Sequence, residues 1–203
     1  EIALQKAKKF KIVWSTDFDK YSAKTHRANY KHNFIESDIN QINGADLDAV
    51  DILVGGFPCQ AFSVAGYRKG FEDPRGNLFF AIKKFIIKFK PKAILLENVK
   101  NLQGHDKGRT FGRIFAELDE LGYSVLHKVM NTSEYTDIPQ NRERIFVVCF
   151  RGESDWNNKE IFRNKKCSLS QSFKFPDKLK RTKSITDLTD KASVDETFYY
   201  TKE

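Results

Sequence analysis

Cys59 is a residue that can do covalent chemistry, and it follows a segment that predicts a strand. It stands after the short, mostly apolar segment 51–54 and two glycines, in the sequence Gly-Gly-Phe-Pro-Cys. A thiolate is a strong nucleophile when nearby cations or a helix N-terminus lower its pKa, and Pro58 stiffens the backbone before it. A single cysteine is more often a small buried hydrophobic residue, so both interpretations of Cys59 stay open.

Glu97 holds a similar position, directly after the all-apolar residues 93–96. A carboxyl group at the end of a buried strand is partly desolvated, which raises its pKa toward values suited to donating a proton. The alternative is a carboxylate that caps a helix or pairs with a cation.

Two arginines precede the last apolar segment, residues 145–150. Arg142 and Arg144 are two positions apart, so the alternation of an extended chain sends both side chains to the same side. Their guanidinium groups could clamp a phosphate or hold the carbonyl of a base. The alternative is an exposed lead-in to a strand, in which arginine pairs with glutamate.

Two aspartates follow apolar segments near the start of the chain. Asp17 comes after residues 11–16, where an acid can accept hydrogen bonds from ribose hydroxyls. It could also cap a helix that begins at Phe18, and one residue could do both. Asp38 and Ile39 follow an apolar pair and could face an adenine ring.

The order of the predicted elements brings these residues together. Short apolar segments alternate with amphipathic ones, which favours an α/β fold with an open, mostly parallel sheet. Such sheets bind ligands at the carboxyl ends of their strands, where the residues above lie. The predicted strands are 11–16, 51–54, 93–96, 123–130 and 145–150, the last two adjacent and antiparallel, and the predicted helices are 1–9, 18–30, 77–89 and 110–121.

The amino-acid composition is typical of a folded globular protein. The chain has 203 residues, of which 40% are hydrophobic and 31% charged, so a packed core is expected and global disorder is excluded. We expect no membrane helix and no signal peptide. The net charge of +8 weakly favours a polyanionic partner.

Cysteine and histidine usage predicts a reducing cytoplasm and no metal. The cysteines are too few for a disulfide framework, and the histidines lack metal-ligand spacing. Cys149 lies in an apolar segment and is expected in the core, and Cys167 is expected to be an exposed thiol. The histidines are His26, His32, His105 and His127.

The composition shifts after residue 150. Residues 164–183 carry seven basic residues and one acid, and periodicity weakens there. We therefore predict a catalytic domain at 1–150, followed at 151–203 by a linker and the start of a target-recognition region. Its lysines could face solvent or phosphates.

Taken in order, the motifs closely resemble those of the DNA (cytosine-5)-methyltransferase family of bacterial restriction–modification systems. They are Phe-Pro-Cys-Gln, Arg-Gly-Asn-Leu-Phe-Phe, Glu-Asn-Val-Lys-Asn and Gln-Asn-Arg-Glu-Arg-Ile-Phe, within residues 1–150. The resemblance implies a Rossmann-like methyltransferase fold with helices on both sheet faces and an antiparallel strand near the end. The family's N-terminal glycine-rich cofactor loop and its C-terminal motifs are not in this sequence, so we expect an internal fragment.

The resemblance also implies residue roles. Cys59 would attack carbon 6 of the target cytosine, Glu97 would contact ring nitrogen 3 and the amine, Arg144 would hold the ring oxygen, and Arg142 would lie near the nucleophile. Asp17 would bind the ribose of S-adenosylmethionine. The rest of the cofactor would contact Phe18, Asp38, Ile39, Pro58 and Leu78, and DNA would contact Gln60, Ser63 and Arg75. Residues 66–75 resemble the family's mobile active-site loop, with Gly66, Gly70 and Gly76 as hinges.

The implied function is methyl transfer to carbon 5 of a flipped-out cytosine in double-stranded DNA, through a covalent cysteine adduct. We expect a monomer in the bacterial cytoplasm, associated with the nucleoid through DNA and with no membrane partner. One alternative is a tRNA cytosine-5 methyltransferase, because one branch of the family methylates RNA. Another is an inactive paralogue that only binds nucleic acid, against which the intact set of Cys59, Glu97, Arg142 and Arg144 argues.

Overall fold

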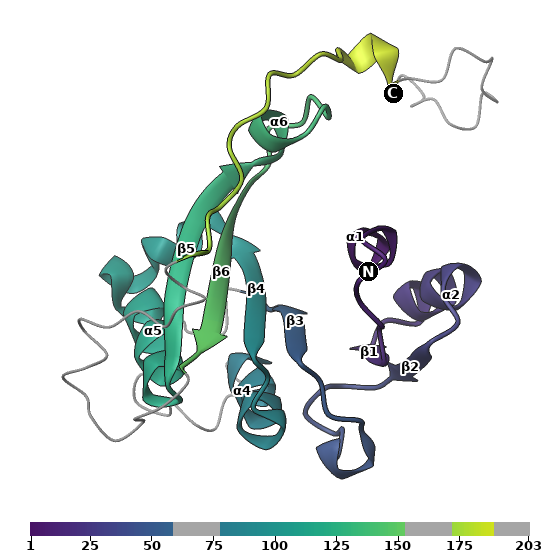
Figure 1. The fold of residues 1–203 in the computed structure, drawn as a ribbon, viewed down its shortest axis with the longest axis vertical. Coiled ribbons are helices and arrows are strands. Elements are labelled where there is room, and N and C mark those ends of the chain that lie inside the picture. The colour runs from purple at the N-terminus through teal and green to yellow at the C-terminus, as the bar shows by residue number, and fades with distance from the viewer. Residues whose placement is uncertain (59–77, 153–171, 189–203) are drawn as a thin grey trace, which may run out of the picture. The chain divides into compact units, whose positions relative to one another are not determined.

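The computed structural model describes residues 1–58, 78–152 and 172–188. The chain divides into two compact units, which we describe separately. The first contains residues 1–129 and 144–174, and the second contains residues 130–143 and 175–203. Figure 1 shows the elements of both. The functional division at residue 150 stays a prediction.

A parallel pair of strands begins the first unit. After the short helix α1 (Ile2–Lys6), strand β1 (Trp14–Asp17) pairs with β2 (Asn33–Glu36), and helix α2 (Lys20–Asn29) connects them. A parallel pair needs such a crossover, because a tight turn can join only antiparallel strands. Thr16 lies opposite Ile35 and donates a side-chain hydrogen bond of 2.9 Å to its carbonyl.

The start of α2 corrects one interpretation of Asp17. The helix begins at Lys20, and its cap is Asp19, whose carboxylate accepts from the amides of Tyr21 (3.0 Å) and Ser22 (2.7 Å). Asp17 is instead the last residue of β1. The predicted helix start was therefore two residues early, and Asp17 is not the residue that caps α2.

The second sheet has four strands in the order β3-β4-β6-β5. Strand β3 (Ile52–Gly56) runs parallel to β4 (Ala93–Val99), and β4 runs antiparallel to β6 (Glu143–Arg151). Strand β5 (Tyr123–Asn131) lies beside β6, and their arrows point in opposite directions in Figure 1. The predicted adjacent, antiparallel strands near the end are confirmed.

One face of this sheet forms the core with two helices, α4 (Leu78–Phe89) and α5 (Arg109–Glu120). On β4 and β6 every second residue is buried, as a half-buried strand requires. The apolar core residues of these elements are Leu53, Phe79, Ile82, Phe85, Ile86, Ile94, Leu96, Ile114, Leu118, Tyr123, Ile145, Val147 and Cys149.

Helices α4 and α5 end where proline and glycine in the sequence predict that they end. Helix α4 ends before Pro91, and Gly122 closes α5 with a φ of 77°, a left-handed conformation that glycine adopts without strain. None of the helices in the described ranges has the length and apolar character to cross a bilayer. The remaining short helices are Gly44–Asp46, Lys100–Gln103, His105–Gly108, α6 (Thr132–Tyr135) and Ile185–Asp187.

The second unit joins two distant stretches of chain. Lys178 forms an ion pair of 2.8 Å with Glu134 on α6, and the Leu179 amide donates to the Glu134 carbonyl at 2.8 Å. Both the amide and the hydroxyl of Thr182 donate to Asp137 at 3.0 Å. Part of the basic segment is thus held by carboxylates of the same unit.

Asp19→Ala is expected to lower the free energy of unfolding by about 1 kcal/mol, because two amides at the start of α2 lose their acceptor. Asp17→Ala is the comparison, and its effect on the same free energy should be smaller, because the Asp17 carboxylate accepts from one exposed amide, that of Asp19, and not from the two at the helix start. Urea unfolding followed by circular dichroism measures both. A greater loss in Asp17→Ala than in Asp19→Ala would contradict the assignment of the cap.

Candidate active site

The carboxyl ends of β3 and β4 meet at the candidate active site. The parallel register places Gly56 opposite Glu97. A Cβ atom on Gly56 would lie 3.5 Å from the Glu97 carboxylate, so this glycine leaves the carboxylate room beside the backbone of β3. Pro58 follows two residues later and is exposed. Cys59, the next residue in the chain, lies outside the described residues.

Asn98 ties the end of β3 to the end of β4. Its side-chain amide donates a hydrogen bond of 2.6 Å to the Phe57 carbonyl, and its side-chain oxygen accepts from the Val99 amide at 2.8 Å. Asn98 is 4% exposed, so both bonds are made where water has little access. This side chain therefore fixes the backbone that leads to Cys59 against the strand that carries Glu97.

Glu97 and Arg144 form an ion pair on the other face of β4 and β6. The Nε atom of Arg144 lies 3.0 Å from Oε1 of Glu97, and Arg144 stands opposite Val99 in the antiparallel register. The side chains are 23% and 38% exposed, for Arg144 and Glu97 respectively, so both can reach a ligand. The interpretation of Glu97 as a carboxylate paired with a cation is confirmed, and its partner is one of the predicted site arginines.

Arg142 belongs to the second unit and is exposed. Its amide donates to Oδ1 of Asn131 at 3.1 Å, and its carbonyl accepts from the Thr132 amide at 3.0 Å. These bonds hold the backbone of Arg142. The role predicted for its side chain near Cys59 stays a prediction.

Asp17 lies at the carboxyl end of β1, where its residue type suits a ribose. One of its carboxylate oxygens accepts from the Asp19 amide at 3.0 Å, and the Ser37 amide donates to its carbonyl at 3.2 Å. Asp17 lines an open cleft of about 490 Å³, together with residues of β1 and α2 that include Thr16 and Asp19. The cleft gives the predicted cofactor contact space for a ligand.

The other predicted cofactor residues lie at strand ends or at a helix start. Phe18 is 74% exposed, and Asp38 is exposed with its carboxylate accepting from the Asn40 amide at 2.9 Å. Ile39 is half-buried against the core. Leu78, also half-buried, is the first residue of α4. Their common contact with one cofactor, which also includes Pro58, stays a prediction.

Of the predictions that remain, the one for Cys149 concerned the core, and the others fall outside the described residues. Cys149 is fully buried, and burial raises the pKa of its thiol to about 12, so it stays protonated at neutral pH. Its predicted place in the core is confirmed. The residues that lie outside the described ranges are Gln60, Ser63, Arg75, Cys167 and the predicted hinges Gly66, Gly70 and Gly76.

Comparison with known proteins shows the family. The family described as C-5 cytosine-specific DNA methylase matches residues 1–203, and the chain belongs to it. Among similar proteins, the Type II methyltransferase M.Bsp6I of Bacillus sp. (strain RFL6) is 44% identical over 96% of this chain and 58% of its own length. M.SsoII of Shigella sonnei is 46% identical over 89% of this chain and 44% of its own. The chain thus spans about half the length of these relatives.

Solved structures confirm the predicted methyltransferase fold. Spodoptera frugiperda DNMT2 has a TM-score of 0.68 at 20% identity, over 97% of this chain and 58% of that one. The S. pombe Dnmt2 methyltransferase has a TM-score of 0.60 at 21% identity, over 82% of this chain and 52% of that one. At such identities the likeness concerns the fold alone.

Asn98→Ala is expected to lower the free energy of unfolding by about 1–3 kcal/mol, because the buried Phe57 carbonyl loses its donor. Asn101→Ala, at an exposed asparagine of the same motif, is the matched control and should change it by less than about 0.5 kcal/mol. Chemical denaturation of both variants provides the measurement. Equal stability of the two would show that Asn98 does not brace the end of β3.

Proposed function

We propose that the protein transfers a methyl group from S-adenosylmethionine to carbon 5 of cytosine in double-stranded DNA, as the modification enzyme of a restriction–modification system. The main observation in support of this proposal is the ion pair between Glu97 and Arg144, at 3.0 Å. Glu97 lies opposite Gly56, and Pro58 and Cys59 follow Gly56 closely in the chain. Similar proteins named Type II methyltransferases support it.

The proposed reaction begins with the Cys59 thiolate. It adds to carbon 6 of the ring, and the electrons of the 5,6 double bond shift toward carbon 5 and nitrogen 3. Carbon 5 then attacks the electrophilic methyl group that S-adenosylmethionine supplies, with S-adenosylhomocysteine as the leaving group. Loss of the proton from carbon 5 restores the double bond and expels the thiolate, so Cys59 is regenerated.

Glu97 and Arg144 suit the polar edge of a cytosine. Nitrogen 3 and the carbonyl oxygen are neighbouring atoms of the ring, just as the carboxylate and the guanidinium are neighbours in the site. The Glu97 carboxyl would share a proton with nitrogen 3, which stabilises the adduct as negative charge develops there. Arg144 would donate to the ring oxygen and, through its ion pair, hold the Glu97 carboxylate in place.

Asp17 would bind the cofactor ribose. Its carboxylate makes one hydrogen bond to the Asp19 amide and lines the open cleft, so its remaining acceptor capacity can serve two hydroxyls. The position follows the rule that nucleotides bind at the carboxyl ends of parallel strands.

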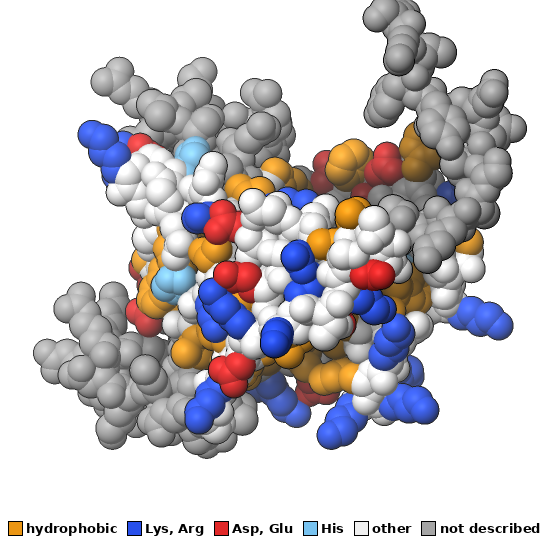
Figure 2. All heavy atoms as spheres, turned by 90° about the horizontal axis from the view of Figure 1, so that it is seen from above, with side chains coloured by type: hydrophobic (Ala, Val, Ile, Leu, Met, Phe, Trp, Pro, Cys, Tyr) orange, Lys and Arg blue, Asp and Glu red, His pale blue; other side chains and the backbone are white. Residues whose placement is uncertain are grey.

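The DNA partner is supported by chemistry and charge. A stacked base is out of reach of a thiolate in a duplex, so the cytosine must be extruded at a cost of a few kcal/mol. The chain carries a net charge of +8, which favours a polyanion. In Figure 2, lysine and arginine side chains stand at several places on the visible face with carboxylates among them, so the charge there is spread out.

Labelled S-adenosylmethionine tests the substrate directly. The full-length protein is incubated with duplex DNA or with tRNA, and the label is counted in each nucleic acid. We expect label in DNA, at carbon 5 of cytosine. Label only in tRNA would overturn the DNA substrate, and no label in either would favour the inactive paralogue.

Cys59→Ser is expected to abolish methyl transfer while leaving DNA affinity largely unchanged, because a neutral hydroxyl is a far weaker nucleophile than a thiolate. Cys149→Ala is the control, since that thiol is buried and protonated. Filter binding and label transfer measure the two properties. Turnover retained in Cys59→Ser would rule out the covalent mechanism.

Glu97→Gln is expected to lower kcat by about 10²- to 10⁴-fold, because an amide cannot share a proton with nitrogen 3. The exposed Glu120, at the end of α5, provides the control variant Glu120→Gln, for which we expect wild-type rates. Single-turnover label transfer separates the chemical step from product release. An unchanged rate in Glu97→Gln would remove this residue from the catalytic set.

A further inference from the structure

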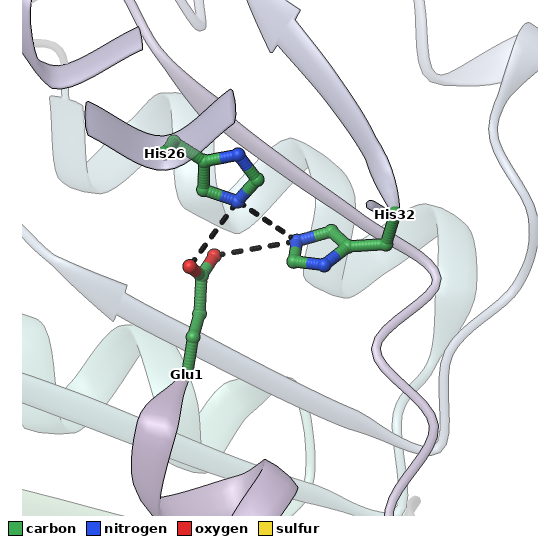
Figure 3. A group of neighbouring side chains, drawn as sticks. All are labelled: Glu1, His26 and His32. Atoms are coloured by element: carbon green, nitrogen blue, oxygen red, sulfur yellow. Dashed lines mark hydrogen bonds and ion pairs between the residues drawn. The ribbon is translucent and has the colours of Figure 1, made fainter. Parts of the chain in front are cut away.

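Two histidines to which the sequence analysis assigns no role meet one carboxylate in the fold. His26 lies in the last part of α2, His32 precedes β2, and Glu1 precedes α1. Figure 3 shows the two Nε2 atoms and the carboxylate of Glu1 pointing toward one another. The Nε2 atoms are 3.0 Å apart, and the carboxylate oxygens lie 3.2 Å from His26 and 3.5 Å from His32.

These separations match the distances between neighbouring ligand atoms around a bound metal ion. Zinc bonds of 2.0–2.1 Å in tetrahedral geometry place neighbouring ligand atoms about 3.3 Å apart. All three distances in the cluster lie close to that value. The Ser15 hydroxyl lies 3.2 Å from Nε2 of His26 and also contacts His32, so a fourth polar group faces the same point.

The buried ring of His26 gives a second, independent reason. His26 is 8% exposed, and its Nδ1 atom is buried without a hydrogen-bond partner among the described residues. Burying an imidazole with an unpaired nitrogen costs free energy, which a strong bond to the other nitrogen would offset. Within the described part of the chain, the polar contacts of this ring go through Nε2, the atom that faces Glu1 and His32.

Aromatic packing fixes the direction in which Nε2 points. The His26 ring stacks on Phe34 with centroids 4.2 Å apart, and Tyr30 lies 4.9 Å away. His32 meets the His26 ring edge-on at 4.6 Å. A ligand that neighbouring rings hold in place loses little freedom when a metal binds, which favours binding.

From these observations we propose that Glu1, His26 and His32 bind one divalent transition-metal cation of the zinc type. Two imidazoles and a carboxylate form a donor set that zinc uses, with a fourth position for water or for Ser15. Magnesium and calcium prefer oxygen ligands alone, so they do not suit this cluster. The expectation of no metal rested on spacing along the chain, whereas this cluster forms only in the fold.

The bound cation would join four segments of the first unit. Its ligands come from the start of α1, from α2 and from the residue before β2, and Ser15 belongs to β1. A two-stranded sheet is only marginally stable by itself, so a cation that ties its strands to two helices would stabilise it. Glu1, Ser15 and His26 also line the cleft that contains Asp17.

Cobalt provides a direct test, because Co²⁺ bound at four-coordinate sites absorbs visible light strongly. The tag-free, full-length protein is treated with a chelator, dialysed and titrated with Co²⁺. We expect one Co²⁺ per chain, displaced by Zn²⁺. His32→Gln should weaken binding by more than about 100-fold, since changes even outside the ligand shell alter affinity 10- to 100-fold. The exposed His127 gives the control His127→Gln, which should bind as the wild type does.

Two further measurements test the metal site even if the His32→Gln variant does not fold. Glu1→Gln changes a partly exposed side chain and should also weaken Co²⁺ binding. Free Zn²⁺ at 100 times its Kd should raise the wild-type Tm by at least about 5 °C. The proposed site would be overturned if the wild type shows no cobalt absorption bands. It would also be overturned if Glu1→Gln binds Co²⁺ as tightly as the wild type does, or if Zn²⁺ leaves the wild-type Tm unchanged. These readouts do not depend on methyl transfer.

Discussion

The parallel pairing of β3 with β4 is the constraint on which the candidate active site depends. It sets Gly56 opposite Glu97, so the chain leaves the sheet beside that carboxylate, and Cys59 follows Gly56 by three positions in the sequence. Asn98 strengthens the same junction from the buried face through its bond to the Phe57 carbonyl. The antiparallel β6 then brings Arg144 to Glu97 from the other side. Three strands thus meet at one point, although their residues are far apart in sequence.

The parallel pair β1 and β2 is held mainly by aromatic packing against a helix. Among the residues that the structure describes, strands β1 and β2 form a two-stranded sheet. The Trp14 ring of β1 packs against Phe85 and Phe89 of α4 with centroids about 6 Å apart. The Trp14 indole also donates to the Asp48 carbonyl at 3.0 Å. These contacts attach the element that carries Asp17 to the helix that packs under β3 and β4. A cation at Glu1, His26 and His32 would instead join α1, α2, β1 and β2 to one another.

The sequence predicted most of the elements, because hydrophobic periodicity and glycine or proline at helix ends act over short distances. It did not predict strand β2, and helix α1 is shorter than the expected 1–9. The sequence also indicated Glu97 and Arg144 as site residues from their positions after and before apolar runs. It misassigned the cap of α2, since Asp17 and Asp19 are equally good capping residues and the choice depends on where β1 ends. Periodicity could have revealed Asn98, which lies on the same face of β4 as Ile94 and Leu96. The meeting of His26 with His32 could not be predicted, because it depends on how α2 packs against β1 and β2.

The covalent mechanism can be observed in a structure of the full-length protein bound to the cofactor and to a duplex with 5-fluorocytosine at the target. Fluorine cannot leave as a proton does, so the reaction should stop at the covalent adduct. We expect continuous density from the Cys59 sulfur to carbon 6 of the extruded base, with the Glu97 carboxyl at hydrogen-bond distance from nitrogen 3 and Arg144 at the ring oxygen. A base that remains stacked, or that is bound with Cys59 and Glu97 in separate cavities, would contradict it.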